Sequence, residues 1–218
     1  MAMSLKEVVY QSILDDIVND EFKPFQILSE SSLVEKYKCS KSPVREALQL
    51  LCNDGVLRSI PRCGYEILLI TREEIEQMLN ARFLIEGGFI AQAMKNIQPE
   101  QFAQLAKLVL SMSHCQDDMW KFWDLNTQFH INLMDISGNS FASAEILRIC
   151  ARLKLAYAQT SKKSWRSGSI SFEVKNHKAI LAAIEKNDIA AARAAIRIDL
   201  MDFCDLQFEL FDFFGEDK

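Results

Sequence analysis

Polar residues interrupt apolar helix faces at four positions in the second half of the chain: Asn126, His130, His177 and Asp199. Asn126 and His130 are four residues apart, so in a helix they share one face, and their neighbours on that face are largely apolar. His177 and Asp199 likewise stand among apolar residues spaced three and four apart. Because a buried polar group without a partner is costly, we expect these side chains to point inward from three helices and to meet.

Two imidazoles and one carboxylate are also the ligand set of non-haem iron oxygenases. One function to consider is therefore that of a helical metalloprotein enzyme with a two-His, one-carboxylate site. It is the alternative to the DNA-binding function argued below from the first 70 residues. A di-iron bundle would need Glu-x-x-His pairs, whereas Glu173 and His177 are four residues apart and the sequence has no second pair. Since nucleophile motifs, P-loops and dinucleotide fingerprints are also missing from the sequence, we predict that the protein is not an enzyme.

The elements that must position these residues are helices. Apolar residues at intervals of three and four predict an all-α bundle of six or seven helices after Thr71. Gln98-Pro99, Gly138-Asn139 and Asn187-Asp188 are among the breaks between them. The predicted helices lie near residues 72–94, 98–112, 116–135, 140–160, 170–186 and 188–214.

The first 70 residues have a different pattern. Helices are predicted over 4–19, 30–37 and 41–53, and two short strands over 56–59 and 65–69. Three helices followed by a β-hairpin, with a turn of about three residues between the second and third helices, indicate a winged helix-turn-helix. The fold class is therefore mainly α, with a DNA-binding domain over 1–70 and an all-α bundle over 71–218.

Charge favours DNA as the partner of the first domain, although the whole chain has a net charge of −5. Residues 1–35 carry five more acidic than basic side chains, and residues 36–62 carry four more basic than acidic ones. Such a local basic patch is what phosphate contact requires. The start of the third helix, where a recognition helix enters the major groove, carries Ser40, Lys41, Ser42 and Arg45, and Arg62 lies at the hairpin tip. A winged helix that serves only protein contacts would not need this concentration of charge.

Bulk composition is that of a soluble globular protein, with 49% hydrophobic and 25% charged residues. No apolar run approaches the roughly 18 residues of a membrane span, and the N-terminal residues lack the apolar region of a signal peptide. The six cysteines are scattered without a Cys-x-x-Cys pair, which is typical of reduced thiols. We therefore expect a cytoplasmic protein with no membrane partner.

Several motifs together resemble the GntR family of bacterial transcription regulators. The first domain contains CSKSPVREAL over residues 39–48, followed by Asp54-Gly55-Val56-Leu57 and by PRCGY over 61–65. The second half is similar to the FadR-type branch, whose effector domain is called FCD. The motifs that carry this second resemblance are Arg82-(x)3-Glu86, Asn126-(x)2-Phe129-His130, Ser137-Gly138-Asn139, Asn176-His177 and Ala195-Ile-Arg-Ile-Asp199.

The resemblance implies a homodimer that binds a palindromic operator in double-stranded DNA. By position, Ser40, Lys41, Ser42 and Arg45 would contact DNA, and Arg62 and Gly64 would form the wing. Ser31 matches a backbone-contact position at which many relatives carry arginine. The resemblance makes residues 71–218 the effector-binding and dimerisation domain. A small effector, usually a carboxylate metabolite, would bind inside its helical bundle and alter DNA affinity.

The resemblance also implies a metal site. The matching FCD positions are typically an aspartate or asparagine and three histidines, and here they are Asn126, His130, His177 and Asp199. The carboxylate has moved from the first position to the last, and the set of nitrogen and oxygen donors suits Zn²⁺, Ni²⁺ or Mn²⁺. The alternative is a metal-free, hydrogen-bonded pocket that binds the effector directly.

Arg82 matches a family position that often faces the effector cavity. Its guanidinium could bind an effector carboxylate as a two-pronged fork. The alternative is an ordinary surface ion pair, because Glu86 lies four residues further along the same helix.

Overall fold

The computed structural model describes residues 3–115, 118–160 and 174–205. The chain forms two compact units: the first extends to Thr71 and the second begins at Arg72. Lys154 and the residues that follow it to the end of their helix group with the first unit. The mainly α fold predicted from the sequence is confirmed.

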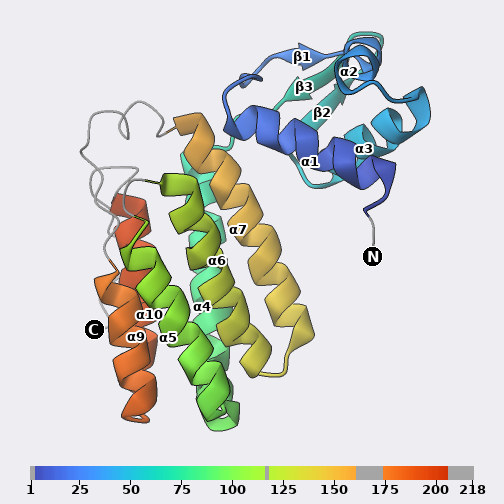
Figure 1. The fold of residues 1–218 in the computed structure, drawn as a ribbon. Helices are drawn as coiled ribbons and strands as arrows, with labels where there is room; N and C mark the ends of the chain where they lie inside the picture. The colour runs from blue at the N-terminus through green and yellow to red at the C-terminus, as the bar shows by residue number, and fades with distance from the viewer. Residues whose placement is uncertain (1–2, 116–117, 161–173, 206–218) are drawn as a thin grey trace. The chain divides into compact units, whose positions relative to one another are not determined.

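The first unit is a winged helix-turn-helix (Figure 1). Its antiparallel sheet has the strand order β1-β3-β2. Strand β1 was not predicted from the sequence, because two residues are too few for an alternating pattern. The elements are α1 (Leu5–Val18), β1 (Ile27–Leu28), α2 (Glu30–Tyr37), α3 (Lys41–Asn53), β2 (Leu57–Ile60) and β3 (Gly64–Ile67).

Local signals explain why α2 begins and ends where the sequence predicted. The Ser29 hydroxyl accepts a hydrogen bond from the Ser32 N–H and so caps α2. Lys38 adopts the left-handed conformation (φ 50°) that ends α2. Helix α3 then buries Val44 and Leu48 completely. This burial leaves the charged face of α3 to solvent, which is the arrangement that a recognition helix needs.

Gly64 holds the wing against β1. Its φ is +131°, and a Cβ atom at this position would lie only 2.4 Å from the Leu28 carbonyl oxygen. No L-residue can keep this close pairing of β1 and β3. Gly64 therefore has a structural role in the wing. Arg62, at the tip of the hairpin, also has a positive φ of 65°.

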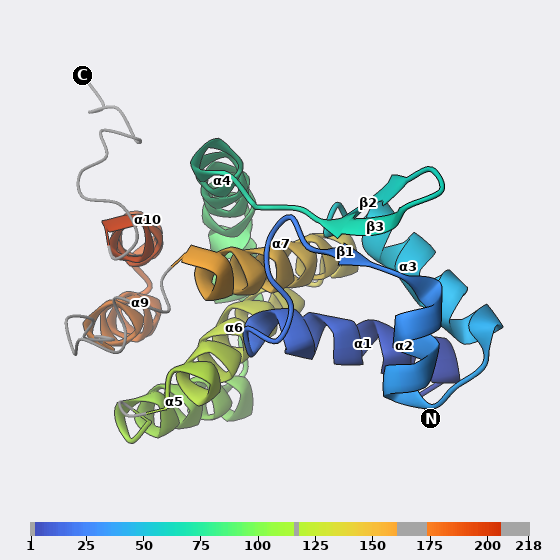
Figure 2. The same ribbon diagram turned by 90° about the horizontal axis from the view of Figure 1, so that it is seen from above.

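The second unit contains six helices among the described residues: α4 (Arg72–Asn96), α5 (Pro99–Ser113), α6 (Met119–Ile136), α7 (Ser140–Thr160), α9 (Lys175–Glu185) and α10 (Ile189–Asp205). Residues 116–117, 170–173 and 206–214 of the predicted helices lie outside the described residues. Helix α4 packs against α6 and α10, α5 against α6 and α9, and α9 against α10, so five of the helices close into a ring (Figure 2). None of the described helices has the length and apolarity that a membrane crossing requires.

A matched pair of leucines on α5 tests this packing. Leu105 is fully buried, whereas Leu110 is 60% exposed. We expect Leu105→Ala to lower the free energy of unfolding by about 2–5 kcal/mol, because it leaves a cavity. Leu110→Ala should change it by only about 0.5 kcal/mol.

Urea unfolding followed by tryptophan fluorescence measures this difference. All three tryptophans lie after residue 115, so the signal reports on the second unit. Equal destabilisation by the two variants would contradict the packing described for α5.

Candidate functional site

Three of the predicted ligands meet at the centre of the helix ring. His130 comes from α6, His177 from α9 and Asp199 from α10. One donor atom from each of these side chains lies within 4.8 Å of the other two. His130 is fully buried, His177 is 2% exposed and the Asp199 side chain is 10% exposed. The expectation that these polar groups point inward from three helices agrees with the structure.

Asp199 lies between the two imidazoles. His130 Nε2 is 3.2 Å from Asp199 Oδ2, and His177 Nδ1 is 3.3 Å from Asp199 Oδ1. Within the described part of the chain, neither His130 Nε2 nor either ring nitrogen of His177 makes an aligned hydrogen bond, although all three atoms are buried. Buried polar atoms without partners are rare in folded proteins. These atoms are therefore candidates for binding a ligand.

Phe129 fixes the orientation of both rings from one side. Its side chain is fully buried. It makes edge-to-face contacts with His130 and His177, at centroid distances of 5.4 and 4.9 Å. Such packing limits rotation of the two imidazole rings away from their present orientations, as a preformed ligand site requires.

Sequence reasoning missed the role of Glu86, which joins Arg82 to the histidines. Arg82 Nε donates a hydrogen bond to Glu86 Oε1 at 2.5 Å, and Glu86 Oε2 lies 2.6 Å from His130 Nδ1. The side chains of Arg82 and Glu86 are only 5% and 0% exposed. The alternative reading of a surface ion pair is therefore wrong. The burial could have been found in the sequence, because both residues continue the apolar stripe of Ile75, Leu79 and Ile90.

Opposite charges keep both buried carboxyl groups ionised. Burial alone raises the pKa of Glu86. The charges and hydrogen bonds of Arg82 and His130 lower it by more than burial raises it, so the net pKa lies below its usual value. Burial also raises the pKa of Asp199, and the two histidines with Arg82 outweigh this effect, so its pKa is well below the usual range. An ionised carboxylate only accepts hydrogen bonds. The proton on His130 Nδ1 is therefore donated to Glu86.

The two histidines titrate differently. Burial lowers the pKa of His177 to about 4, so its imidazole is neutral at pH 7. Burial also lowers the pKa of His130, but the charge of Glu86 more than compensates, and the net pKa is raised. A neutral imidazole is the form that ligates a metal. The Nδ1 hydrogen bond of His130 to a carboxylate is the orienting contact that metal-ligating histidines usually make.

The donor set fits a divalent cation. Ligands about 2.1 Å from a tetrahedral ion lie about 3.4 Å apart. The distances of 3.2 and 3.3 Å run from the two histidines to different oxygens of Asp199. One donor atom from each side chain lies within 4.8 Å of the other two, so the three side chains would draw together around an ion. Two imidazoles and a carboxylate suit zinc, nickel or manganese. Asn126 lies one turn before His130 on α6 and is half-buried. Its role as a further ligand stays a prediction.

Arg82 could bind an anion close to the cluster of His130, His177 and Asp199. Its Nη2 atom is buried and has no hydrogen-bond partner among the residues that the structure describes. A carboxylate placed at Nη2 would receive a charge-assisted hydrogen bond. The residue predicted to bind an effector is thus tied through Glu86 to a residue predicted to bind metal.

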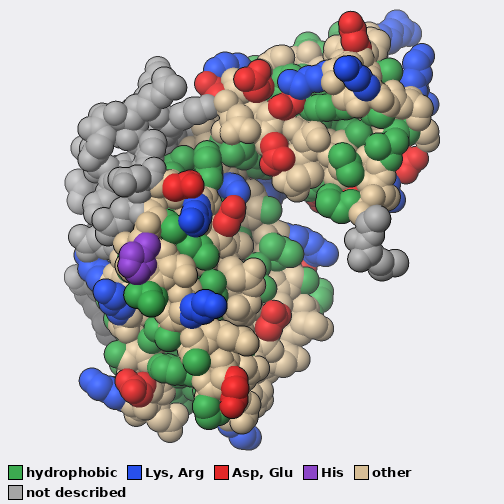
Figure 3. Space-filling view, viewed as in Figure 1, with side chains coloured by type: hydrophobic (Ala, Val, Ile, Leu, Met, Phe, Trp, Pro, Cys, Tyr) green, Lys and Arg blue, Asp and Glu red, His purple; other side chains and the backbone are tan. Residues whose placement is uncertain are grey.

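The predicted DNA contacts lie on the surface of the first unit. Ser31, Ser40, Lys41, Ser42, Arg45 and Arg62 are all exposed, and Gly64 is half-buried. Figure 3 shows Lys and Arg side chains over α2 and around the turn into α3. Ser40 begins α3 without a side-chain cap. The first amides of α3 are therefore left to solvent, where they can donate to a phosphate.

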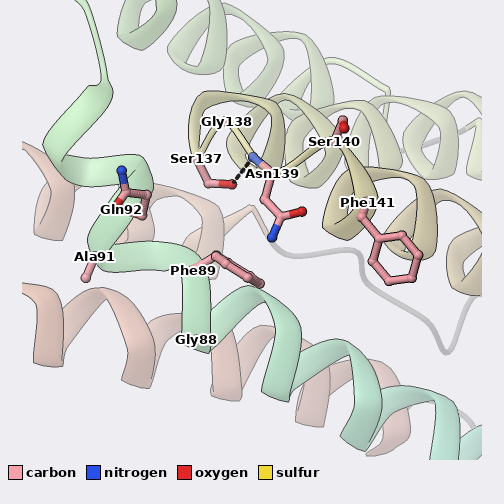
Figure 4. Close-up of a pocket in the computed structure, with 9 residues that line it drawn as sticks. All are labelled: Gly88, Phe89, Ala91, Gln92, Ser137, Gly138, Asn139, Ser140 and Phe141. Atoms are coloured by element: carbon pink, nitrogen blue, oxygen red, sulfur yellow. Dashed lines mark hydrogen bonds between the residues drawn. The ribbon is translucent and has the colours of Figure 1, made fainter.

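A shallow groove lies apart from the histidines, between α4 and the turn from α6 into α7 (Figure 4). Phe89 and Phe141 flank it, Asn139 and Gln92 contribute polar atoms, and Gly88 adds no side chain. Phe141 is 74% exposed. The groove contains none of the predicted site residues.

Two family profiles match the chain. The profile described as "Bacterial regulatory proteins, gntR family" matches residues 5–67, and the profile described as "FCD domain" matches residues 77–201.

Several known proteins are similar to the chain. One is the uncharacterized HTH-type transcriptional regulator YdhC of Bacillus subtilis (strain 168), 28% identical over 133 residues, which cover 60% of this chain and 59% of that relative. Another is the HTH-type transcriptional repressor GlaR of Escherichia coli (strain K12), 23% identical over 88% of this chain and 90% of its own length. The solved structure of E. coli McbR/YncC has the same fold, with a TM-score of 0.75 and 21% identity over 94% of this chain and 98% of its own.

Two Arg–Glu pairs on α4 have the same spacing and opposite burial, and they provide a matched test. Glu86→Gln removes a buried charge between Arg82 and His130, and it should lower the free energy of unfolding by about 3–5 kcal/mol. Glu76→Gln removes the partner of Arg72, whose side chain is 51% exposed, and should cost about 0–1 kcal/mol.

Urea unfolding of chelator-treated protein, followed by tryptophan fluorescence, gives both values. If Glu86→Gln proved as mild as Glu76→Gln, the Glu86 carboxylate would not hold the network together.

Proposed function

The chain belongs to the gntR family of bacterial regulatory proteins and carries an FCD domain, and from this premise we propose that it is a dimeric, effector-responsive regulator of a palindromic operator. The alternative enzyme function is not favoured, because the named relatives are transcriptional regulators. The observation that carries the proposal is the buried cluster of His130, His177 and Asp199, in which three imidazole nitrogens lack an aligned hydrogen bond among the described residues. Burying these polar side chains costs free energy, and a bound ligand would offset that cost.

DNA would be read by the N-terminal end of α3. Lys41 and Arg45 supply charge there, and Ser40 and Ser42 supply hydroxyl groups that can contact phosphates or bases. Arg62 at the tip of the wing and Ser31 on α2 would contact the backbone. The two copies of α3 in a dimer would each read one half-site, so operator symmetry would follow protein symmetry.

A divalent cation would be held by His130, His177 and Asp199, with Asn126 as a further oxygen donor. Zinc, nickel or manganese bound there would act as a Lewis acid that attracts an anionic ligand. Glu86 would keep His130 in the tautomer that leaves Nε2 free. Burial keeps His177 neutral and therefore ready to bind.

The effector would be a small carboxylate. Arg82 Nη2 is buried and lacks a partner among the described residues, so an anion there would satisfy it. The same anion could reach the cation, because the charge of Arg82 is near enough to Asp199, a proposed ligand, to lower the pKa of its carboxyl group. We infer that the ligand bridges these two positive centres.

A second copy of the chain would dock on the α4–α7 face. This face exposes Leu84 by 61%, Phe141 by 74% and Leu147 by 51%. Gly88 leaves open space above α4, because a Cβ atom added there would meet nothing within 4 Å. The groove beside it in Figure 4 could receive an apolar side chain of the partner. Exposed apolar surface of this kind is typical of interaction sites.

Helix α4 would transmit the signal. It begins at Arg72, with four residues between it and the end of β3 at Ile67, and it carries both Arg82 and Glu86. An effector that moved α4 would change the spacing of the two recognition helices. Since half-site spacing must match the DNA helical repeat, a small displacement would change operator affinity.

Operator binding tests the reading of α3. Arg45→Ala should weaken binding to the operator by about 5- to 150-fold, the usual effect of losing one two-pronged arginine–guanine contact. Arg148→Ala is the matched control, because Arg148 on α7 is also exposed and also pairs with a glutamate, Glu145. Fluorescence anisotropy with an operator obtained by selection would compare them. Equal losses, or no loss in Arg45→Ala, would contradict the assignment.

Metal content tests the bundle site. Protein purified without chelator or nickel resin should contain about one divalent metal per chain, and His177→Ala should lose it. His114→Ala should keep it, because His114 is exposed at the end of α5. Elemental analysis of the three proteins measures this. No metal in any of them, even after dialysis against zinc, would favour a metal-free pocket that binds the effector directly.

A further inference from the structure

Glu30 forms a two-pronged ion pair with the arginine proposed to read DNA. Arg45 Nε donates to Glu30 Oε1 at 3.0 Å, and Arg45 Nη2 donates to Glu30 Oε2 at 2.9 Å. Glu30 is the first residue of α2, and Arg45 lies near the start of α3. The pair therefore bridges the two helices at the surface where DNA is expected.

Glu30 is held more firmly than its partner. Its side chain is 26% exposed, compared with 58% for Arg45. The Tyr65 hydroxyl of β3 approaches Glu30 Oε1 at 3.5 Å, and the N-terminus of α2 favours a negative charge at this position. The hydrogen bond from Arg45 also lowers the pKa of Glu30, so the carboxylate is ionised at neutral pH. The more exposed arginine is thus paired with a better-anchored carboxylate.

The geometry leaves one edge of the guanidinium open. Arginine has five N–H donors: one on Nε and two on each terminal nitrogen. Glu30 accepts from Nε and from one donor of Nη2, so both donors of Nη1 and the second donor of Nη2 are not used by Glu30. These donors form a second fork. Guanine presents two acceptors, N7 and O6, to the major groove, and an arginine fork matches them. Arg45 can therefore bind guanine without leaving Glu30.

We propose that Glu30 is a positioning residue that makes Arg45 selective for guanine, an inference that rests on the proposed DNA-reading role of Arg45. A free arginine binds any phosphate, which strengthens binding to all sequences alike. A carboxylate beside it repels phosphates and directs the fork toward a base edge. The ordering cost of the side chain is also met before DNA binds, which favours the specific complex.

The chain offers a matched control on the same unit. Arg58 on β2 donates through both Nε and Nη2 to a single oxygen of Glu66, Oε2. Glu66→Gln therefore removes the same charge from the first unit as Glu30→Gln, but it leaves the Arg45–Glu30 pair intact. Any effect of net charge on DNA binding should be similar in these two variants.

Selection from a random duplex library, followed by affinities for the selected operator and its single-base variants, tests the proposal on the full chain. Arg45→Ala should abolish the preference at one base pair of each half-site. Glu30→Gln should reduce the preference at that same base pair by about 5-fold or more, while keeping or raising affinity for unrelated DNA. Glu66→Gln should leave that preference unchanged.

The outcomes distinguish the proposed role of Arg45 from the proposed role of Glu30. If Arg45→Ala retained every base preference, the proposed role of Arg45 would fail, and the role of Glu30 with it. If Arg45→Ala lost one preference that Glu30→Gln kept, only the positioning role of Glu30 would be overturned. If Glu30→Gln weakened binding to all duplexes by the same factor, Glu30 would stabilise the fold and would not set specificity.

Discussion

The fully buried carboxylate of Glu86 is the constraint on which the second unit depends. A charge without water is stable only when its partners are fixed around it. Here one oxygen accepts from Arg82 on the same helix and the other faces His130 on α6. The ring of α4, α6, α5, α9 and α10 must therefore close with these side chains in register, because any slip would leave the charge unpaired. Asp199 extends the network from α10 and brings His177 of α9 into it.

The network also joins the two residues for which we propose effector binding and metal binding. Arg82 and His130 share a single carboxylate, so a displacement of either side chain changes the hydrogen bonding of the other. A ligand that accepts from Arg82 Nη2 would thus act on His130, which we propose as a metal ligand, and on α4 together. Because α4 follows the wing after four residues, the fold connects the buried chemistry to the DNA-binding unit through the chain itself.

Much of this arrangement could be predicted from the sequence. A capping serine and apolar spacing located α2 correctly, apolar spacing located α3, and the polar interruptions of apolar stripes predicted that His130, His177 and Asp199 point inward. Strand β1 was missed because two residues carry no periodicity. The role of Glu86 was missed because an arginine and a glutamate four residues apart are typical of an exposed helix face, although both residues continue the apolar stripe of α4. The contact of Glu30 with Arg45 joins two helices, so spacing along the chain does not indicate it.

The most direct test of the central claim is nitrogen NMR of the histidine rings, in full-length protein freed of metal and then titrated with zinc. The chain has only three histidines, and His114, which is exposed, serves as an internal reference. We expect one equivalent of zinc to shift a ring nitrogen of His130 and one of His177, while His130 keeps its Nδ1 proton toward Glu86 and His114 does not change. Rings of His130 and His177 that remain unaltered at one equivalent of zinc would contradict the account.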